Sequence, residues 1–169
     1  MRQLASAFVS ASAIRTASTG SQPEEYEGAL NKRGIMIGRN AYPILYHHWS
    51  RVGAGVEQPF EYVCSTLRRL GFCNYGLSLS DVLGRGHQLN LDPCAWEMGP
   101  AIAKMFEMAP RRRIYYAMSP YQQPDSLLQE MQEMIYVLEH DGSKVWFHAV
   151  NKARSNFTPD DEVFFAVPH

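Results

Sequence analysis

The spacing of apolar positions predicts short helices in the middle of the chain. Between residues 59 and 70, apolar side chains recur at intervals of three and four, as they do along one face of an α-helix. Pro59 suits the first turn of such a helix and Gly71 suits its end. The apolar stripe consists of Phe60, Val63, Cys64, Leu67 and Leu70.

The same spacing predicts a longer helix over residues 126–138. Ser126 and Gln129 have the separation of a capping box, and Gly142 is placed to stop the helix. Its apolar face consists of Leu127, Leu128, Met131, Met134, Ile135 and Leu138.

Prolines divide the region between these two helices. Asp92 before Pro93 predicts the start of a helix that breaks at residues 99–100. A second short helix is predicted over 101–108 and a third over 111–118, separated by Pro110.

The remaining segments predict less regular structure. Residues 31–40 are expected to form an extended connector, and Pro43 favours a short helix in the aromatic segment that follows. Residues 144–150 and 162–169 are either short strands or extended docking strips. The predicted fold class is therefore mainly α, with several short helices and extended N- and C-terminal arms.

The N-terminal 20 residues have the composition of a mitochondrial transit peptide. They contain Arg2 and Arg15, are rich in serine, and no acidic residue precedes Glu24. Apolar residues fall on one helical face, as in transit peptides. We therefore expect mitochondrial import, with residues 1–20 as a targeting arm and 21–169 as one small helical domain with an extended C-terminal tail.

Composition narrows the function without deciding it. The 16 basic and 17 acidic residues give a net charge of −1, which argues against a nucleic-acid-binding protein. Nine Tyr, eight Phe and three Trp predict either a surface buried against partners or a well-filled hydrophobic core within the chain itself. The three cysteines form no C-x-x-C pair, so a disulfide framework is not expected.

Neither a catalytic set nor a metal or cofactor site is predicted. The six histidines lack metal-binding spacing, and Cys94 and His87 have no recognisable catalytic context. The strongest polar feature is the run Arg111, Arg112 and Arg113, which precedes Tyr115 and Tyr116. Such a run either contacts phosphates and partner carboxylates or is a solvated charge run.

The order of these segments resembles a known family. Tyr75-Gly76-Leu77 is followed by Asp81, then by the short helix predicted over 101–110, the arginine-rich segment and the last amphipathic helix. This order over residues 60–140 resembles the 14 kDa (subunit 7) family of the mitochondrial cytochrome bc1 complex, the ubiquinol–cytochrome c reductase binding proteins. Ser80 departs from the acidic residue usual in that family.

The resemblance implies a non-catalytic accessory subunit of respiratory complex III, without cofactors, on the matrix side of the mitochondrial inner membrane. It would contact cytochrome b and the core subunits, support assembly and electron transport, and use anionic phospholipid as a further partner. The implied docking residues are Tyr75, Gly76, Leu77, Asp81, Arg111, Arg112, Arg113, Tyr115 and Tyr116.

Other functions remain open at this point. They are a mitochondrial ribosomal protein, an accessory subunit of another respiratory complex or of ATP synthase, and a small soluble enzyme. Short helices cut by prolines bury little surface, so we also expect the isolated chain to be unstable without a partner.

Overall fold

The computed structural model is dominated by strands, and the prediction of a mainly α fold is wrong. It describes residues 14–46, 58–124, 131–152 and 156–168. Of these residues, 36% are in strands and 27% in helices, and eight strands form one curled sheet with the shape of a half-barrel.

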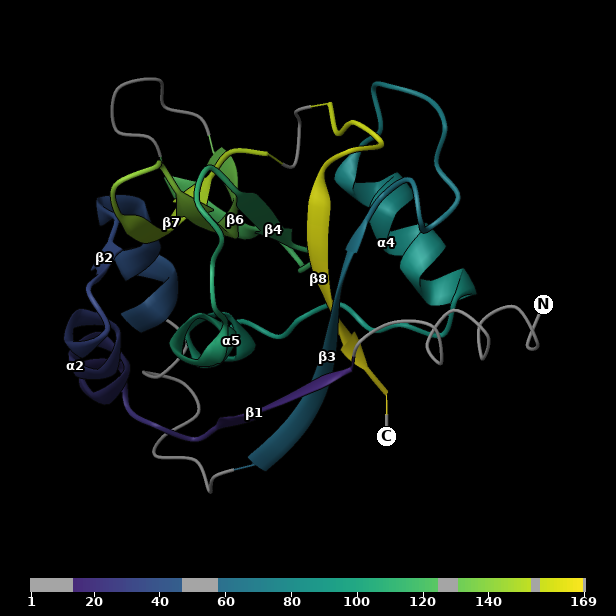
Figure 1. Ribbon diagram of the computed structural model, residues 1–169. Helices are drawn as coiled ribbons and strands as arrows, with labels where there is room; N and C mark the ends of the chain where they lie inside the picture. Colours follow the sequence, from purple (N-terminus) through teal and green to yellow (C-terminus); the bar gives the residue numbers. More distant parts are fainter. Residues whose placement is uncertain (1–13, 47–57, 125–130, 153–155, 169) are drawn as a thin grey trace.

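The sheet mixes parallel and antiparallel pairs (Figure 1). In spatial order, seven of the strands are β1 (Arg15–Thr19), β3 (Gln58–Thr66), β8 (Glu162–Val167), β4 (Arg113–Tyr116), β6 (Met131–His140), β7 (Val145–Val150) and β2 (Ile35–Ile37). The eighth strand, β5 (Tyr121–Pro124), pairs with the first half of β6. The β4–β8 and β2–β7 pairs are parallel, and the other pairs are antiparallel.

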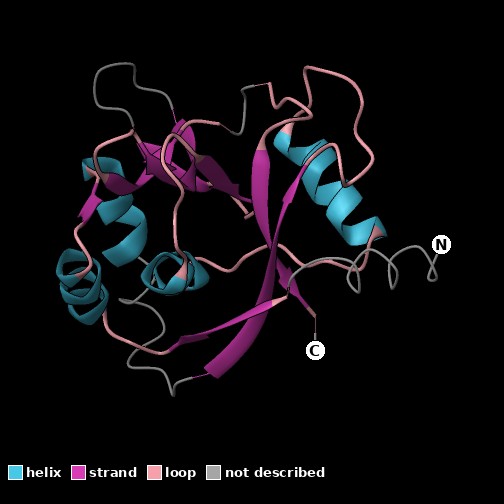
Figure 2. Cartoon of the chain, in the orientation of Figure 1, coloured by secondary structure: helices cyan, strands magenta, loops and turns pink. Residues whose placement is uncertain are grey.

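Helices cover the sheet on both sides (Figures 1 and 2). Helix α5 (Met98–Met105) packs on one face, which we call the inner face, where Gly99 lies against the ring of Tyr136. Helix α2 (Pro23–Lys32) contacts α5. Helix α4 (Leu79–Gln88) packs on the opposite, outer face, where Gly86 meets Phe165. A short 3-10 helix, η1 (Arg39–Ala41), leads into helical residues 42–46.

The predicted helix over 59–70 is instead β3 followed by a turn. Tyr62 and Val63 are adjacent and point to opposite faces of the strand, yet both are buried because helices cover both faces. The strand therefore shows no alternation of apolar and polar residues, and its apolar positions happen to have the spacing of one face of a helix.

The predicted helix over 126–138 fails for the same reason. Residues 131–138 belong to β6, and five consecutive residues from Met134 to Leu138 are buried. Residues 126–130 lie outside the described part of the chain. The arginine-rich segment predicted as a helix over 111–118 contains β4.

Other local predictions had mixed outcomes. The strand interpretation of residues 144–150 and 162–169 is confirmed by β7 and β8. The helix predicted over 101–108 exists as α5, but it begins at Met98, so Gly99 and Pro100 lie in its first turn rather than at a break. The helix predicted after Pro93 is absent from residues 93–97.

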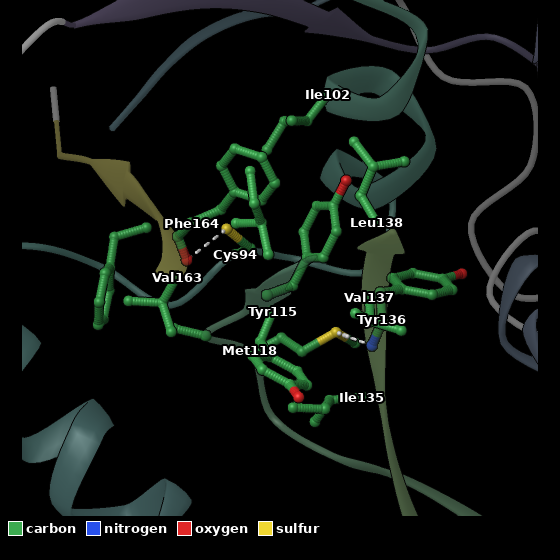
Figure 3. Packing of buried hydrophobic residues seen from close by; sticks show 14 of the residues in the cluster. Cys94, Ile102, Tyr115, Met118, Ile135, Tyr136, Val137, Leu138, Val163 and Phe164 are labelled. Atoms are coloured by element: carbon green, nitrogen blue, oxygen red, sulfur yellow. Dashed lines mark hydrogen bonds between the residues drawn. The ribbon is translucent and has the colours of Figure 1, made fainter. Parts of the chain in front are cut away.

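The inner face carries an aromatic core (Figure 3). The Tyr116 ring lies 4.8 Å from that of Phe164, and the Tyr136 ring lies 4.6 Å from that of Phe147. The thiol of Cys94 donates to the carbonyl of Phe164, and both groups are drawn in Figure 3. These aromatic side chains are fully buried within the chain, which favours a hydrophobic core of its own as the explanation of the aromatic content.

The N-terminal arm contributes to the sheet. Residues 15–19 of the expected targeting segment form β1, which pairs with β3 and buries Ala17. In the described part of the chain, no helix combines the length and the apolar character needed to cross a membrane.

Candidate functional site

The Tyr75–Leu77 segment forms a corner on the surface. Tyr75 is 72% exposed, and Gly76 adopts a φ of +83°, which glycine tolerates better than other residues. Leu77 exchanges backbone hydrogen bonds with Phe157. Asp81 caps helix α4: its carboxylate accepts hydrogen bonds from the backbone N–H and hydroxyl of Ser78 at 2.8 and 2.7 Å. This contact gives Asp81 a structural role.

The arginine run leads into a strand, and two of its three guanidinium groups are paired within the chain. Arg112 donates two hydrogen bonds to Glu162, at 2.6 and 2.7 Å, and Arg113 donates to Glu139. Arg111 has a positive φ of +58° and no hydrogen bond or ion pair to another described residue. The run is therefore only partly available to a partner.

Two of the expected docking residues are buried. Tyr116 is fully buried and donates a hydrogen bond to the carbonyl of Gly99, at 3.1 Å. Tyr115 is 6% exposed, and its ring lies 5.4 Å from that of Phe157. Since Phe157 also pairs with Leu77, it connects the two groups of residues that the resemblance implied for docking.

The outer face of the sheet has two adjoining hollows at the end of the β6–β7 hairpin. We call the first the His148 hollow; its volume is about 490 Å³. The second, the Arg111 hollow, has about 420 Å³ and shares Glu139 and Asp141 with the first. The His148 hollow is lined by Gly38, Arg39, Asn40, Glu139, Asp141, Trp146 and His148. The Arg111 hollow is lined by Arg111, Arg112, Arg113, Tyr115, Glu139, His140, Asp141 and Asp161.

Strand register brings together the polar side chains of the two hollows. Arg113, Glu139 and Trp146 stand opposite one another on three neighbouring strands, so all three share the outer face. His148 is the diagonal neighbour of Glu139, and its Nε2 lies 3.1 Å from Oε2 of Glu139. The Glu139 carboxylate is thus held from two sides, by Arg113 and by His148.

The environment of Glu139 keeps its carboxylate ionised. Burial alone would raise its pKa, but hydrogen bonding and the positive charge of Arg113, together with the contact from His148, outweigh burial and lower the pKa. An ionised carboxylate only accepts hydrogen bonds, so Nε2 of His148 is the donor in this contact. The other ring nitrogen, Nδ1, has no hydrogen-bond partner among the described residues.

Asp141 is occupied by its own turn. Its Oδ1 accepts hydrogen bonds from the backbone N–H of Lys144 and Ser143, and its Oδ2 accepts from the indole of Trp146 at 3.0 Å. These contacts, the backbone N–H of Lys144 first, hold the pKa of Asp141 far below its usual range. They also fix the edge of the Trp146 indole at the wall of the hollow.

Gly38 allows the opposite wall of the hollow to approach the sheet. A Cβ atom at this position would lie 2.4 Å from Cβ of His148, so only glycine fits without a backbone shift. The backbone N–H of Gly38 donates to the carbonyl of Phe147 at 2.9 Å, which anchors η1 beside β7. Arg39 and Asn40 follow directly, and both are exposed.

The two carboxylates of the hollow and the cysteines at positions 64 and 94 are not poised for proton donation or nucleophilic attack. Both carboxylates of the hollow have lowered pKa values, so neither is poised as a general acid at neutral pH. Burial raises the pKa of Cys64 to about 12 and that of Cys94 further, so both are poor nucleophiles. Among the described residues, no group of three His, Cys, Asp or Glu side chains could hold a metal ion.

Comparisons with protein-family models, curated proteins and solved structures each found no match for this chain.

The sequence analysis missed Glu139, Asp141, Trp146 and His148. One signal could have revealed them: an Asp-Gly pair at residues 141–142 lies between two apolar runs, which is typical of a β-hairpin. A hairpin centred there would have placed Glu139 and Trp146 opposite each other.

Proposed function

We propose that this protein is a non-catalytic binding protein that holds a small polar ligand in the His148 hollow. The observation that carries the proposal is the chain of contacts from Arg113 through Glu139 to His148, which links three strands and fixes Glu139 and His148 at the wall of this hollow. Groups that are already in place lose little conformational entropy when a ligand binds.

The size and lining of the hollow support a small ligand. Its volume of about 490 Å³ falls within the range of small-molecule sites. Arg39, Asn40 and the free ring nitrogen of His148 offer hydrogen bonds beside the aromatic surface of Trp146. This set suits a molecule with several polar groups.

A blocking variant tests the proposal. Ligand-observed NMR with a mixture of neutral and charged fragments should detect binders of the wild-type protein. Asn40→Trp, at an exposed rim position, should fill the hollow and abolish their binding, while Asn31→Trp, at an exposed position of α2, should preserve it. Binders that tolerate Asn40→Trp as well as Asn31→Trp would contradict a site in this hollow.

Membership of complex III stays a prediction. The resemblance relied on helices at 59–70, 111–118 and 126–138, and the described residues of these segments lie mainly in strands and turns. The geometry therefore does not favour complex III over another assembly. Purification of the tagged protein from detergent-solubilised mitochondria would test it: co-purifying b- and c-type cytochromes would support membership, and ribosomal proteins would contradict it.

A further inference from the structure

We infer that the ligand of the His148 hollow carries a small oxyanion, either a carboxylate or a phosphate, and that Arg39 is its main anchor. This inference rests on the proposed binding function and names the chemical class of the ligand. It follows from which charged groups of the hollow are already paired.

The two acids of the hollow have little capacity left for a cationic ligand. Glu139 accepts hydrogen bonds from Arg113 and His148, and Asp141 accepts from two backbone N–H groups, a hydroxyl and an indole. A cation in the hollow would compete with contacts that are built into the sheet and its hairpin. The charge of Glu139 is therefore balanced by Arg113, whereas Asp141 is held by uncharged donors and keeps its negative charge.

Arg39 is the charged group with spare capacity. It lines the hollow, is exposed, and makes no hydrogen bond or ion pair with another described residue. A guanidinium group presents a planar fork of donors that matches a carboxylate or a phosphate through two parallel hydrogen bonds. The side-chain amide of Asn40, also at the rim, can donate to the same ligand.

The surroundings add positive charge rather than remove it. In the adjoining Arg111 hollow, Arg112 and Arg113 are neutralised by Glu162 and Glu139, and Arg111 has no such partner among the described residues. Asp161, which also lines that hollow, lies 3.8 Å from Lys152. Among the described residues, the two guanidinium groups without an acidic partner, Arg39 and Arg111, therefore outnumber the one carboxylate without a cationic partner, Asp141. This excess of positive charge favours an anion near Arg39 over a neutral ligand.

NMR titration of the full chain tests the inference, with the indole N–H of Trp146 as the reporter at the wall of the hollow. The probes are inorganic phosphate, succinate, glucose 6-phosphate and glucose, each at constant ionic strength. We expect a saturable shift with at least one anionic probe and a much weaker response to glucose. Arg39→Gln should lower the affinity for the anionic probe at least 10-fold, which corresponds to the loss of one charge-assisted contact.

Arg69→Gln is the matched control, because it removes the same charge from an exposed position in the turn after β3. It should leave the affinity unchanged. Saturation by phosphate and glucose 6-phosphate alone would assign a phosphate ligand, and saturation by succinate alone would assign a carboxylate ligand.

The failures of the two proposals are distinguishable. If glucose binds as well as glucose 6-phosphate, or if Arg39→Gln binds the anions normally, the oxyanion inference is wrong while a binding site remains. If no probe binds and the fragment mixture also yields no binder blocked by Asn40→Trp, both proposals are wrong.

Discussion

Two glycines of helix α4 allow a sharp test of how this helix packs on the sheet. Gly86 faces the sheet, and a Cβ atom there would lie 2.3 Å from Cε1 of the Phe165 ring. Gly84 lies in the same helix, and a Cβ atom there would meet no atom within 4 Å. The substitutions Gly86→Ala and Gly84→Ala therefore add the same methyl group in two opposite environments.

The two substitutions should change the free energy of unfolding by different amounts. In a helix interior, alanine is favoured over glycine by about 1 kcal/mol, so Gly84→Ala should raise the free energy of unfolding by roughly that amount. At Gly86 the same gain is opposed by overpacking against a buried aromatic ring, which costs about 1–3 kcal/mol. The difference between the two variants isolates the contact and should be about 1–3 kcal/mol.

Urea unfolding followed by circular dichroism measures this difference. A domain of this length shifts its Tm by about 2–4 °C per kcal/mol, so thermal unfolding provides a second readout. The slope of the free energy against urea concentration should be the same in both variants. If Gly86→Ala is as stable as Gly84→Ala, α4 does not pack on Phe165 as described.

The same unfolding experiment addresses the expectation that the isolated chain is unstable. That expectation assumed short helices with little buried surface. The described core consists of side chains from one continuous sheet and its covering helices, and many of them are fully buried. We therefore expect a single cooperative transition for the isolated wild-type chain, and a gradual loss of signal would contradict this.

Two further predictions concern ionisable groups. In the native protein at pH 8, a thiol reagent should modify exposed Cys73 quickly. Cys64, whose pKa is raised to about 12, and buried Cys94 should react only after unfolding. Modification of two or three thiols of the native protein at the same rate would contradict this. The contacts that lower the pKa of Glu139 stabilise the fold above the ordinary glutamate pKa, and this stabilisation is lost as pH falls through the native pKa. Glu139→Gln should therefore reduce the acid sensitivity of unfolding below about pH 4.5, and exposed Glu107→Gln is the control for the removal of one acid elsewhere.

The strands that the sequence analysis predicted as helices, β3, β4 and β6, share one physical feature: burial on both faces. In β3, Phe60 and Tyr62 face the inner side while Val63 and Ser65 face α4, and all four are buried. A strand of this kind shows no alternation, so spacing alone cannot distinguish it from a helix. Tyrosine, valine and threonine in residues 61–66 favour a strand, and that composition was the better guide.

Of the two strands that were anticipated, β7 shows the opposite situation, whereas β8 is buried on both faces from Val163 to Ala166. In β7, buried Phe147 and Ala149 alternate with partly exposed Trp146 and His148, because this strand has one open face. The open face is also where the candidate site lies. A strand with visible alternation therefore indicated, in this chain, both the secondary structure and the surface on which polar side chains can gather.

The pairing within the site depends on register, which is a long-range property. Glu139 meets Arg113 across 26 residues of chain and His148 across nine. The hairpin at Asp141 determines the contact between Glu139 and His148, and this hairpin can be predicted from the sequence because the turn is local. The contact between Glu139 and Arg113 requires β4 to lie beside β6, which depends on β5, β8 and the aromatic core of the inner face. Because a shift of one residue in β4 would move Arg113 to the other face, the charge pairing with Glu139 itself favours the observed register, so the same contact that supports the fold also shapes the wall of the hollow.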